Sequence, residues 1–184
     1  MVNIGILGYA SVGKTSLFNL FRKKFKERGG NILGGQLGGA KKGNTVTIDF
    51  IRFIHTTEPQ DSKIVHTLYG TGGHRHRITD YYRSFVIRNS DVFICMFDLS
   101  IGLEPQLTFY EQFELPVRSI VLVFNKFDLA EKPIVEHFIA QTEDFFVNKK
   151  KKLIFDRYIT CAIPKSQYAI YNENAVNSVL ILCN

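Results

Sequence analysis

The sequence is poor in cysteine and has no long uninterrupted apolar run. Cys95, Cys161 and Cys183 are an odd number of thiols without metal-ligand spacing, which argues against a disulfide-rich secreted protein and predicts reduced thiols in a cytoplasmic one. No basic segment precedes the apolar start, and the final LILCN is not a prenylation box. We therefore expect no signal peptide, membrane-spanning segment or lipid anchor.

The length and the charge of the chain further restrict the class of protein. At 184 residues the chain is expected to form a single domain spanning 1–184, and 45% hydrophobic with 22% charged residues is ordinary for a globular protein. The net charge is +6, and residues 1–52 hold nine Lys or Arg against two acidic residues. A basic face can attract nucleic acid or an anionic membrane. A solvated helix face and charges attracted to bound phosphates are the preferred explanation of this excess of positive charge, so we expect no nucleic acid, while peripheral membrane association stays open.

Apolar runs alternate with amphipathic segments along the chain. The predicted strands are 2–8, 46–54, 64–70, 92–98, 119–125 and 153–161, and the predicted helices are 15–28, 75–89, 104–113, 131–148 and 167–182. This alternation predicts an α/β fold with a six-stranded, mostly parallel sheet and helices on both faces. The link between the second and third strands is too short for a crossover helix, which predicts one antiparallel hairpin. The glycine-rich tract 29–44 is expected to be mobile.

A phosphate-binding pattern follows the first predicted strand. GYASVGKT supplies Gly8, then four residues, then Gly13, Lys14 and Thr15 at the start of the first predicted helix. Glycines let backbone N–H groups curl around a phosphate, the lysine bridges the β- and γ-oxygens, and the threonine hydroxyl binds Mg²⁺. The predicted phosphate-binding residues are Gly8, Ala10, Ser11, Val12, Gly13, Lys14, Thr15 and Ser16.

NKFD, at 125–128, directly follows the fifth predicted strand, and here the chain resembles the Ras-like small GTPases. The resemblance implies a P-loop G domain that binds GTP and GDP. It implies that Asp128 accepts hydrogen bonds from the guanine N1–H and exocyclic amine, which adenine does not present. It further implies that Asn125 ties this loop to the phosphate loop and that the Lys126 stem covers one face of the base.

Further motifs of that family appear in order. NTVTIDF, at 44–50, resembles the switch I stretch, which implies that Thr45 is an Mg²⁺ ligand in the triphosphate state; Thr47 is the alternative. TCA, at 160–162, is similar to the family's Ser-Ala-Lys loop. This places Cys161, Ala162 and Ile163 beside guanine, with the Ala162 N–H toward O6 and isoleucine in place of the usual lysine.

LYGTGGHRHR, at 68–77, resembles a switch II motif with two changes. Gly70 stands where most small GTPases carry the aspartate that holds Mg²⁺ through a water, as in MglA-like polarity GTPases, which also lack it. Gly73 aligns with the glycine that senses the γ-phosphate. His74 replaces the usual glutamine and resembles the histidine of translational GTPases that orients the attacking water. Asp49 is a candidate replacement carboxylate; the alternative is an exposed edge residue.

The resemblance implies a molecular switch that uses Mg²⁺ and hydrolyses GTP slowly. The implied catalytic residues are His74, Lys14 and Gly73, the implied Mg²⁺ ligands are Thr15 and Thr45, and the implied partners are protein effectors with an activator or exchange factor. The alternative is a nucleotide-bound structural subunit with little turnover, favoured by the missing aspartate. A P-loop nucleotide kinase does not explain NKFD.

Overall fold

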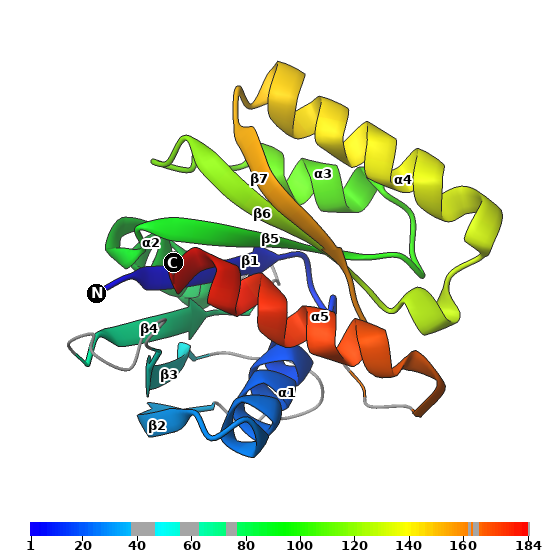
Figure 1. The fold of residues 1–184 in the computed structure, drawn as a ribbon. Coiled ribbons are helices and arrows are strands. Elements are labelled where there is room, and N and C mark those ends of the chain that lie inside the picture. Colours follow the sequence, from blue (N-terminus) through cyan, green and yellow to red (C-terminus); the bar gives the residue numbers. More distant parts are fainter. Residues whose placement is uncertain (38–46, 56–62, 73–76, 162, 164–165, 184) are drawn as a thin grey trace.

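Seven strands form a single mixed sheet in the computed structural model, which describes residues 1–37, 47–55, 63–72, 77–161, 163 and 166–183 (Figure 1). The strands are β1 (Asn3–Gly8), β2 (Asn31–Gln36), β3 (Asp49–Ile54), β4 (Val65–Gly70), β5 (Val92–Asp98), β6 (Ser119–Asn125) and β7 (Leu153–Ile159). Their order across the sheet is β2-β3-β4-β1-β5-β6-β7. The β4-β1-β5-β6-β7 part is parallel, and β3 pairs antiparallel with both β4 and β2. The predicted α/β class and the hairpin of β3 and β4 are confirmed.

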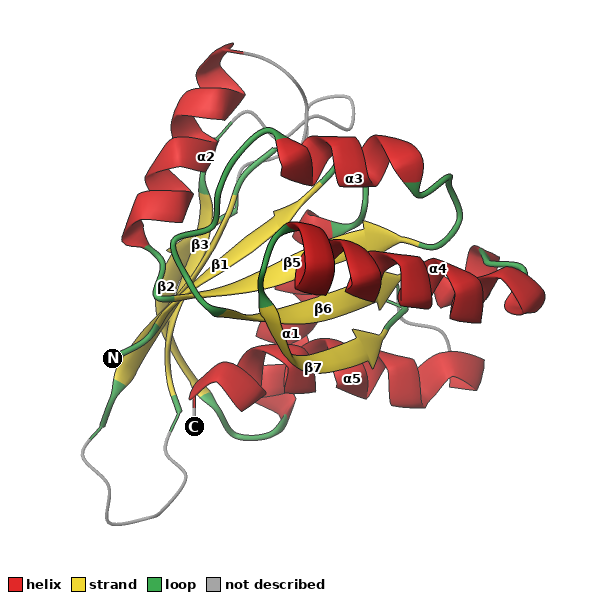
Figure 2. Ribbon diagram, turned by 90° about the horizontal axis from the view of Figure 1, so that it is seen from above, coloured by secondary structure: helices red, strands yellow, loops and turns green. Residues whose placement is uncertain are grey.

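Helices cover both faces of the sheet (Figure 2). They are α1 (Lys14–Glu27), α2 (Arg77–Asn89), α3 (Glu104–Glu111), α4 (Lys132–Asp144) and α5 (Ala169–Leu180). A π-helical turn (Phe145–Lys149) extends α4, and short 3₁₀ turns occupy Phe127–Leu129, Ser166–Tyr168 and Ile181–Cys183. Helices α1 and α5 lie on one face, and α3 and α4 lie on the other. Among the helices that the structure describes, none is long and apolar enough to cross a lipid bilayer.

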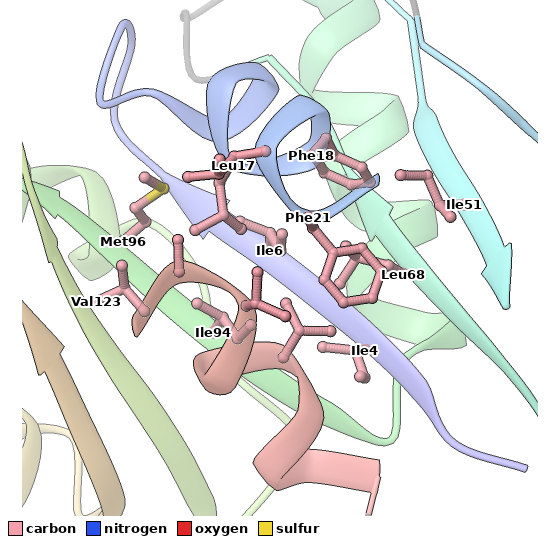
Figure 3. Close-up of a cluster of buried hydrophobic side chains, with 14 of the residues drawn as sticks. Ile4, Ile6, Leu17, Phe18, Phe21, Ile51, Leu68, Ile94, Met96 and Val123 are labelled. Atoms are coloured by element: carbon pink, nitrogen blue, oxygen red, sulfur yellow. The ribbon is translucent and has the colours of Figure 1, made fainter. Parts of the chain in front are cut away.

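Two buried clusters, one on each face, hold these layers together. Ile4 and Ile6 of β1 pack with Leu17, Phe18 and Phe21 of α1 on the α1 and α5 side (Figure 3). The opposite cluster joins β1, β5 and β6 to α2, α3, α4 and the π-helical turn. Successive strand residues point to opposite faces, so a central strand that is covered on both sides must be apolar nearly throughout. Strands β1, β5 and β6 meet this requirement, and their carboxyl ends share one edge of the sheet.

The prediction of six strands was wrong, because β2 lies inside the glycine-rich tract that was expected to be mobile. Glycine has low strand propensity, which hid the strand from sequence reasoning. The pairing with β3 needs glycine: a Cβ on Gly35 would lie 2.5 Å from the Phe50 carbonyl oxygen. The pairing of β2 with β3 also contains a register shift between Ile32 and Gly34, as at a β-bulge. Residues 38–44 of the tract lie outside the described residues.

Candidate nucleotide-binding site

The phosphate-binding loop joins the carboxyl end of β1 to the first turn of α1. Gly13 adopts a left-handed conformation with φ 100°, and Ser11 does so with φ 60°. A Cβ on Gly13 would overlap the Asn125 side-chain amide, so the residue is glycine both for its backbone and for the space beside it. No acidic residue lies in the first turn of α1, and no described side chain caps its N-terminus. The positive end of the helix dipole is thus compatible with an anion.

Lys14 turns its ammonium back onto the loop. Its Nζ donates to the carbonyl oxygens of Gly8 at 2.7 Å and Tyr9 at 2.8 Å, and the residue is only 9% exposed. Burial and the positive charge of Arg83 lower the pKa of Lys14 from 10.5 to about 7, although the carboxylate of Asp49 partly opposes them. The negative charge near the ammonium is therefore too small to offset its burial. A bound polyphosphate is the kind of ligand that would supply more negative charge.

Asp49 faces the phosphate-binding loop from β3. It is 2% exposed, and the Thr15 hydroxyl donates to its Oδ2 at 3.3 Å. The alternative of an exposed edge residue is therefore wrong. Asp49 lies directly opposite Gly70 in the antiparallel pairing of β3 with β4. The two strands thus place a carboxylate from Asp49 next to the position where the switch II motif lacks one.

Gly70 itself has no room for a side chain. A Cβ at this position would lie 2.6 Å from the ring of Phe18, which is fully buried in the core against α1. Heavy atoms this close would overlap, so a carboxylate on β4 would require the Phe18 ring to move. The packing of the core therefore disfavours a carboxylate at position 70.

The NKFD loop follows β6 and contacts the phosphate-binding loop. Asn125 Nδ2 donates to the Val12 carbonyl at 2.8 Å, and its Oδ1 accepts from the Thr160 hydroxyl at 3.1 Å. The carboxylate of Asp128 accepts from the Cys161 thiol at 3.1 Å. Three loops, after β1, β6 and β7, are thereby joined at one edge of the sheet. Ligands of open α/β sheets bind in the crevice outside the carboxyl ends of the strands.

The remaining predicted site residues fall into two groups. Ala10 and Ser16 are partly buried, Ser11 is exposed, Val12 is buried and Ile163 is exposed. Four others lie outside the described residues, namely Thr45, Gly73, His74 and Ala162. Thr47, the alternative to Thr45, is described; its hydroxyl is buried and lacks a hydrogen-bond partner among the described residues.

Two charged residues near the site were missed by sequence reasoning. Asp98 ends β5, is 1% exposed and forms an ion pair with Lys126, with 2.5 Å between Oδ2 and Nζ. Arg83 of α2 is buried, lies over the Phe109 ring and pairs with Asp80 at 2.9 Å. The position of Asp98 at the end of a buried strand is a signal that could have been used. Arg83 carries no such signal, because its place depends on how α2 packs.

Oxygen ligands suitable for Mg²⁺ are present at this edge of the sheet. Mg²⁺ usually binds one or two protein oxygens and completes its octahedron with phosphate oxygens and water. The Thr15 hydroxyl and the Asp49 carboxylate supply such oxygens side by side. No group of three or more His, Cys, Asp or Glu side chains suited to a metal occurs among the described residues. The residues present thus fit a magnesium ion bound together with a nucleotide.

Comparison with known proteins supports the fold. Neither a known protein family nor a curated protein matches the sequence. The chain superposes on a bacterial selenocysteine-specific elongation factor EF-Sec with a TM-score of 0.65 and 15% identity, covering 99% of this chain and 28% of that one. It is similar to the translation elongation factor SelB from Methanococcus maripaludis, which was solved in complex with the GTP analogue GppNHp. The TM-score is 0.62 at 18% identity, and the match covers 100% of this chain and 34% of that one. It is also similar to the G235S variant of SsGBP, with a TM-score of 0.56 and 17% identity, covering 99% of this chain and 56% of that one.

These similarities define the class of fold. The mixed sheet, the antiparallel hairpin and the phosphate-binding loop are those of a P-loop G domain like the ones in the two elongation factors. The chain spans less than two thirds of the length of each of these proteins.

Proposed function

We propose that this protein binds GTP and GDP with Mg²⁺ and slowly hydrolyses GTP to GDP and phosphate. The observation that carries the proposal is the hydrogen bond from Asn125 Nδ2 to the Val12 carbonyl, at 2.8 Å. It fixes the NKFD loop against the phosphate-binding loop. A ligand that uses both loops must contain a base and a polyphosphate, and a nucleotide has both.

The phosphate side of the site depends on Lys14 and the first turn of α1. Lys14 Nζ now donates to two loop carbonyls, and phosphate oxygens would be stronger acceptors for the same ammonium because they are charged. The free N–H groups at the start of a helix favour the same anion. Lys14 would therefore hold the terminal phosphates and compensate charge during their transfer.

Thr15 and Asp49 would hold the magnesium ion. When bound, Mg²⁺ neutralises negative charge on the β- and γ-phosphates. Thr15 contributes a hydroxyl from α1, and Asp49 contributes a carboxylate from β3 that stands in for the switch II aspartate absent at Gly70. Thr45 is proposed as a further ligand in the triphosphate state. Asp49→Asn should raise the Mg²⁺ concentration needed to retain GDP, whereas dissociation that is equally sensitive to chelator in both proteins would argue against this role.

Guanine selectivity is assigned to Asp128. Its carboxylate is held at the loop after β6 and contacts the Cys161 thiol at 3.1 Å. A thiol is a weak donor, so the N1–H and amine of guanine can replace it as stronger donors to a charged acceptor. The Ala162 N–H is proposed to reach guanine O6, and Ile163 to lie at the rim of the base.

Hydrolysis is assigned to Gly73 and His74 together with Lys14. His74 would orient the attacking water, and the Gly73 N–H would contact the γ-phosphate. Protein effectors, with an activator or exchange factor, are the proposed partners. A second reading, a GTP-holding structural subunit with little turnover, draws support from Gly70, which removes a carboxylate of the usual switch II motif.

Two measurements test the proposal. Equilibrium binding should favour GDP and GTP over ADP and ATP, and equal competition by ATP would refute guanine selectivity. Phosphate release over multiple turnovers should then exceed that of His74→Ala by about 10–100-fold, the typical contribution of one positioned catalytic group. Tight GTP binding without turnover above this variant would favour the structural subunit.

A further inference from the structure

Lys126 has an unusual backbone conformation next to the proposed base site. It lies between the end of β6 and the 3₁₀ turn Phe127–Leu129, in the left-handed region with φ 61° and ψ 34°. A residue with a Cβ pays an energetic cost there and persists only where its surroundings hold it. A lysine side chain also has many rotamers, so a stem that must lie along a flat base needs an anchor at its far end.

Asp98 provides that anchor from the end of β5. Its Oδ2 accepts from Lys126 Nζ at 2.5 Å, while its Oδ1 accepts from the Ser100 backbone N–H at 2.8 Å and the Ser100 hydroxyl at 2.6 Å. Asp98 lies opposite Asn125 in the parallel pairing of β5 with β6, which places the carboxylate one residue from Lys126 in register. Both carboxylate oxygens therefore have defined partners.

The backbone of Asp98 is fixed equally firmly by a fully buried glutamine. The Asp98 N–H donates to Gln106 Oε1 at 2.8 Å, and Gln106 Nε2 donates to the Asp98 carbonyl at 2.9 Å. Gln106 lies on α3, so a helix, the Ser100 turn and the strand together determine where the carboxylate is. Such a rigid support is what keeps a binding residue in its productive geometry.

We propose that Asp98 is a positioning residue that orders the Lys126 side chain for guanine-nucleotide binding before the nucleotide arrives. This inference rests on the proposed function, because it concerns the same base site. With the ammonium tied to Asp98, the Lys126 stem loses its rotamer freedom during folding rather than during binding. Preorganisation of this kind strengthens binding by removing an entropic cost, and its loss mostly accelerates dissociation.

The expected changes in rate distinguish an effect on binding of the base from an effect on the phosphates. GDP and GTP share the base, so Asp98→Asn should accelerate dissociation of both by the same factor, about tenfold. Hydrolysis of GTP that is already bound, measured in a single turnover, should stay within about twofold of the wild type. A residue that acted on the phosphate side would change that rate or the ratio of the two dissociation rates.

A double-mutant cycle separates positioning from general stabilisation. Asp98→Asn and Lys126→Met are made singly and together, and dissociation of a fluorescent GDP is measured for each protein. If Asp98 acts through Lys126, Asp98→Asn should change the rate less than twofold in the Lys126→Met background. An equal effect in both backgrounds would mean that Asp98 acts through the fold, and the inference would be overturned.

Because Asp98 is buried, its replacement can impair folding, and a milder variant covers that case. Ser100 is exposed, and Ser100→Ala removes one of the donors to the carboxylate. It should accelerate GDP dissociation about threefold, and only when Lys126 is present. Glu143→Gln breaks the 2.6 Å ion pair between Glu143 of α4 and Arg157 of β7, which involves neither Asp98 nor Lys126, and serves as the matched control with no expected effect.

The outcomes distinguish this inference from the proposed function. A wild-type protein that binds no guanine nucleotide would overturn both. Normal wild-type binding with unchanged dissociation in Asp98→Asn and Ser100→Ala would overturn the positioning role alone. Faster dissociation that depends on Lys126 would support it.

Discussion

Nucleotide affinity should depend on pH through Lys14. In the nucleotide-free protein, burial and the charge of Arg83 bring the pKa of this lysine to about 7. A phosphate next to the ammonium favours its charged form and restores a high pKa. Above about pH 7 the lysine is mostly neutral before binding and must take up a proton as the nucleotide binds. Affinity should therefore fall as the pH rises.

The size of the effect follows from the pKa. A group with a pKa of about 7 is half charged at that pH and about 3% charged at about pH 8.5. If only the charged form binds, the dissociation constant for GDP should rise about 15-fold over this interval, which is about 1.6 kcal/mol. The terminal phosphate of GDP, whose pKa lies near 6, contributes little in this range. The interval ends below the pH at which guanine itself ionises.

Calorimetry can detect the proton directly. GDP is titrated at about pH 8 in two buffers that differ in ionisation enthalpy, and the difference in heat gives the protons taken up, which should be about 0.9 per nucleotide for a pKa of about 7. Lys14→Arg is the matched control, since a guanidinium stays charged throughout this range. Its affinity, although weaker, should be flat with pH.

The stability of the nucleotide-free protein should respond with the opposite sign. Unfolded Lys14 has a pKa near 10.5 and folded Lys14 has one of about 7, so the unfolded chain binds more protons between these values. Stability contributed by this group therefore rises with pH across that window.

A GDP affinity that changes less than about threefold between about pH 7 and about pH 8.5, with no proton uptake, would show that Lys14 is already charged before binding and would refute the reasoning.

Three further predictions follow from individual contacts. Asp128→Asn should weaken GDP binding by about 2 kcal/mol or more, because charge-assisted bonds to guanine are lost; unchanged affinity by fluorescence titration would contradict the assignment. Gly13→Ala should lower stability by about 1–3 kcal/mol and abolish nucleotide retention, because the new Cβ would overlap the Asn125 amide. Gly29→Ala has the same left-handed strain without a neighbour within 4 Å and is the control for the overlap; equal losses in urea unfolding would implicate strain alone. His66 is buried and its pKa is lowered from 6.5 by burial, so its protonation favours unfolding and stability should fall as the pH drops below about 6.5. His66→Phe should reduce this loss, and identical shifts of the urea midpoint between about pH 7 and about pH 5 in both proteins would exclude the histidine as its source.

Local sequence patterns were sufficient for most of the scaffold. Each of the five helices and each predicted strand is present, because apolar periodicity and a strand–glycine–helix turn depend on neighbours along the chain. Boundaries moved by a few residues: the strand predicted from residue 46 begins at Asp49. The strand β2 was missed because it is glycine-rich, and the close approach of Gly35 to Phe50 on β3 is a tertiary contact that the sequence does not reveal.

The candidate site likewise contains residues that local motifs predict and residues that only the tertiary structure reveals. GYASVGKT and NKFD are contiguous motifs, so the loops predicted to bind phosphate and base could be proposed from the sequence, with their expected chemistry following from residue type. The roles of Asp49 and Asp98 could not be settled in that way. Asp49 was a candidate carboxylate with an exposed edge residue as the alternative, and only the antiparallel register showed that it lies opposite Gly70. The proximity of Asp98 to Lys126 emerged only from the pairing of β5 with β6.

The sequence alone determined where the two loop motifs lie and which residues are predicted to hold phosphate and read a base, because such motifs consist of residue types at short spacings in one loop. The tertiary structure decided which distant side chain completes each group. It brought Asp49 to Thr15 across 34 positions and Lys126 to Asp98 across 28. The Phe18 ring fills the space beside Gly70, and the buried carboxylate opposite this glycine lies on β3. Such choices depend on strand register and packed volume, which no local pattern encodes.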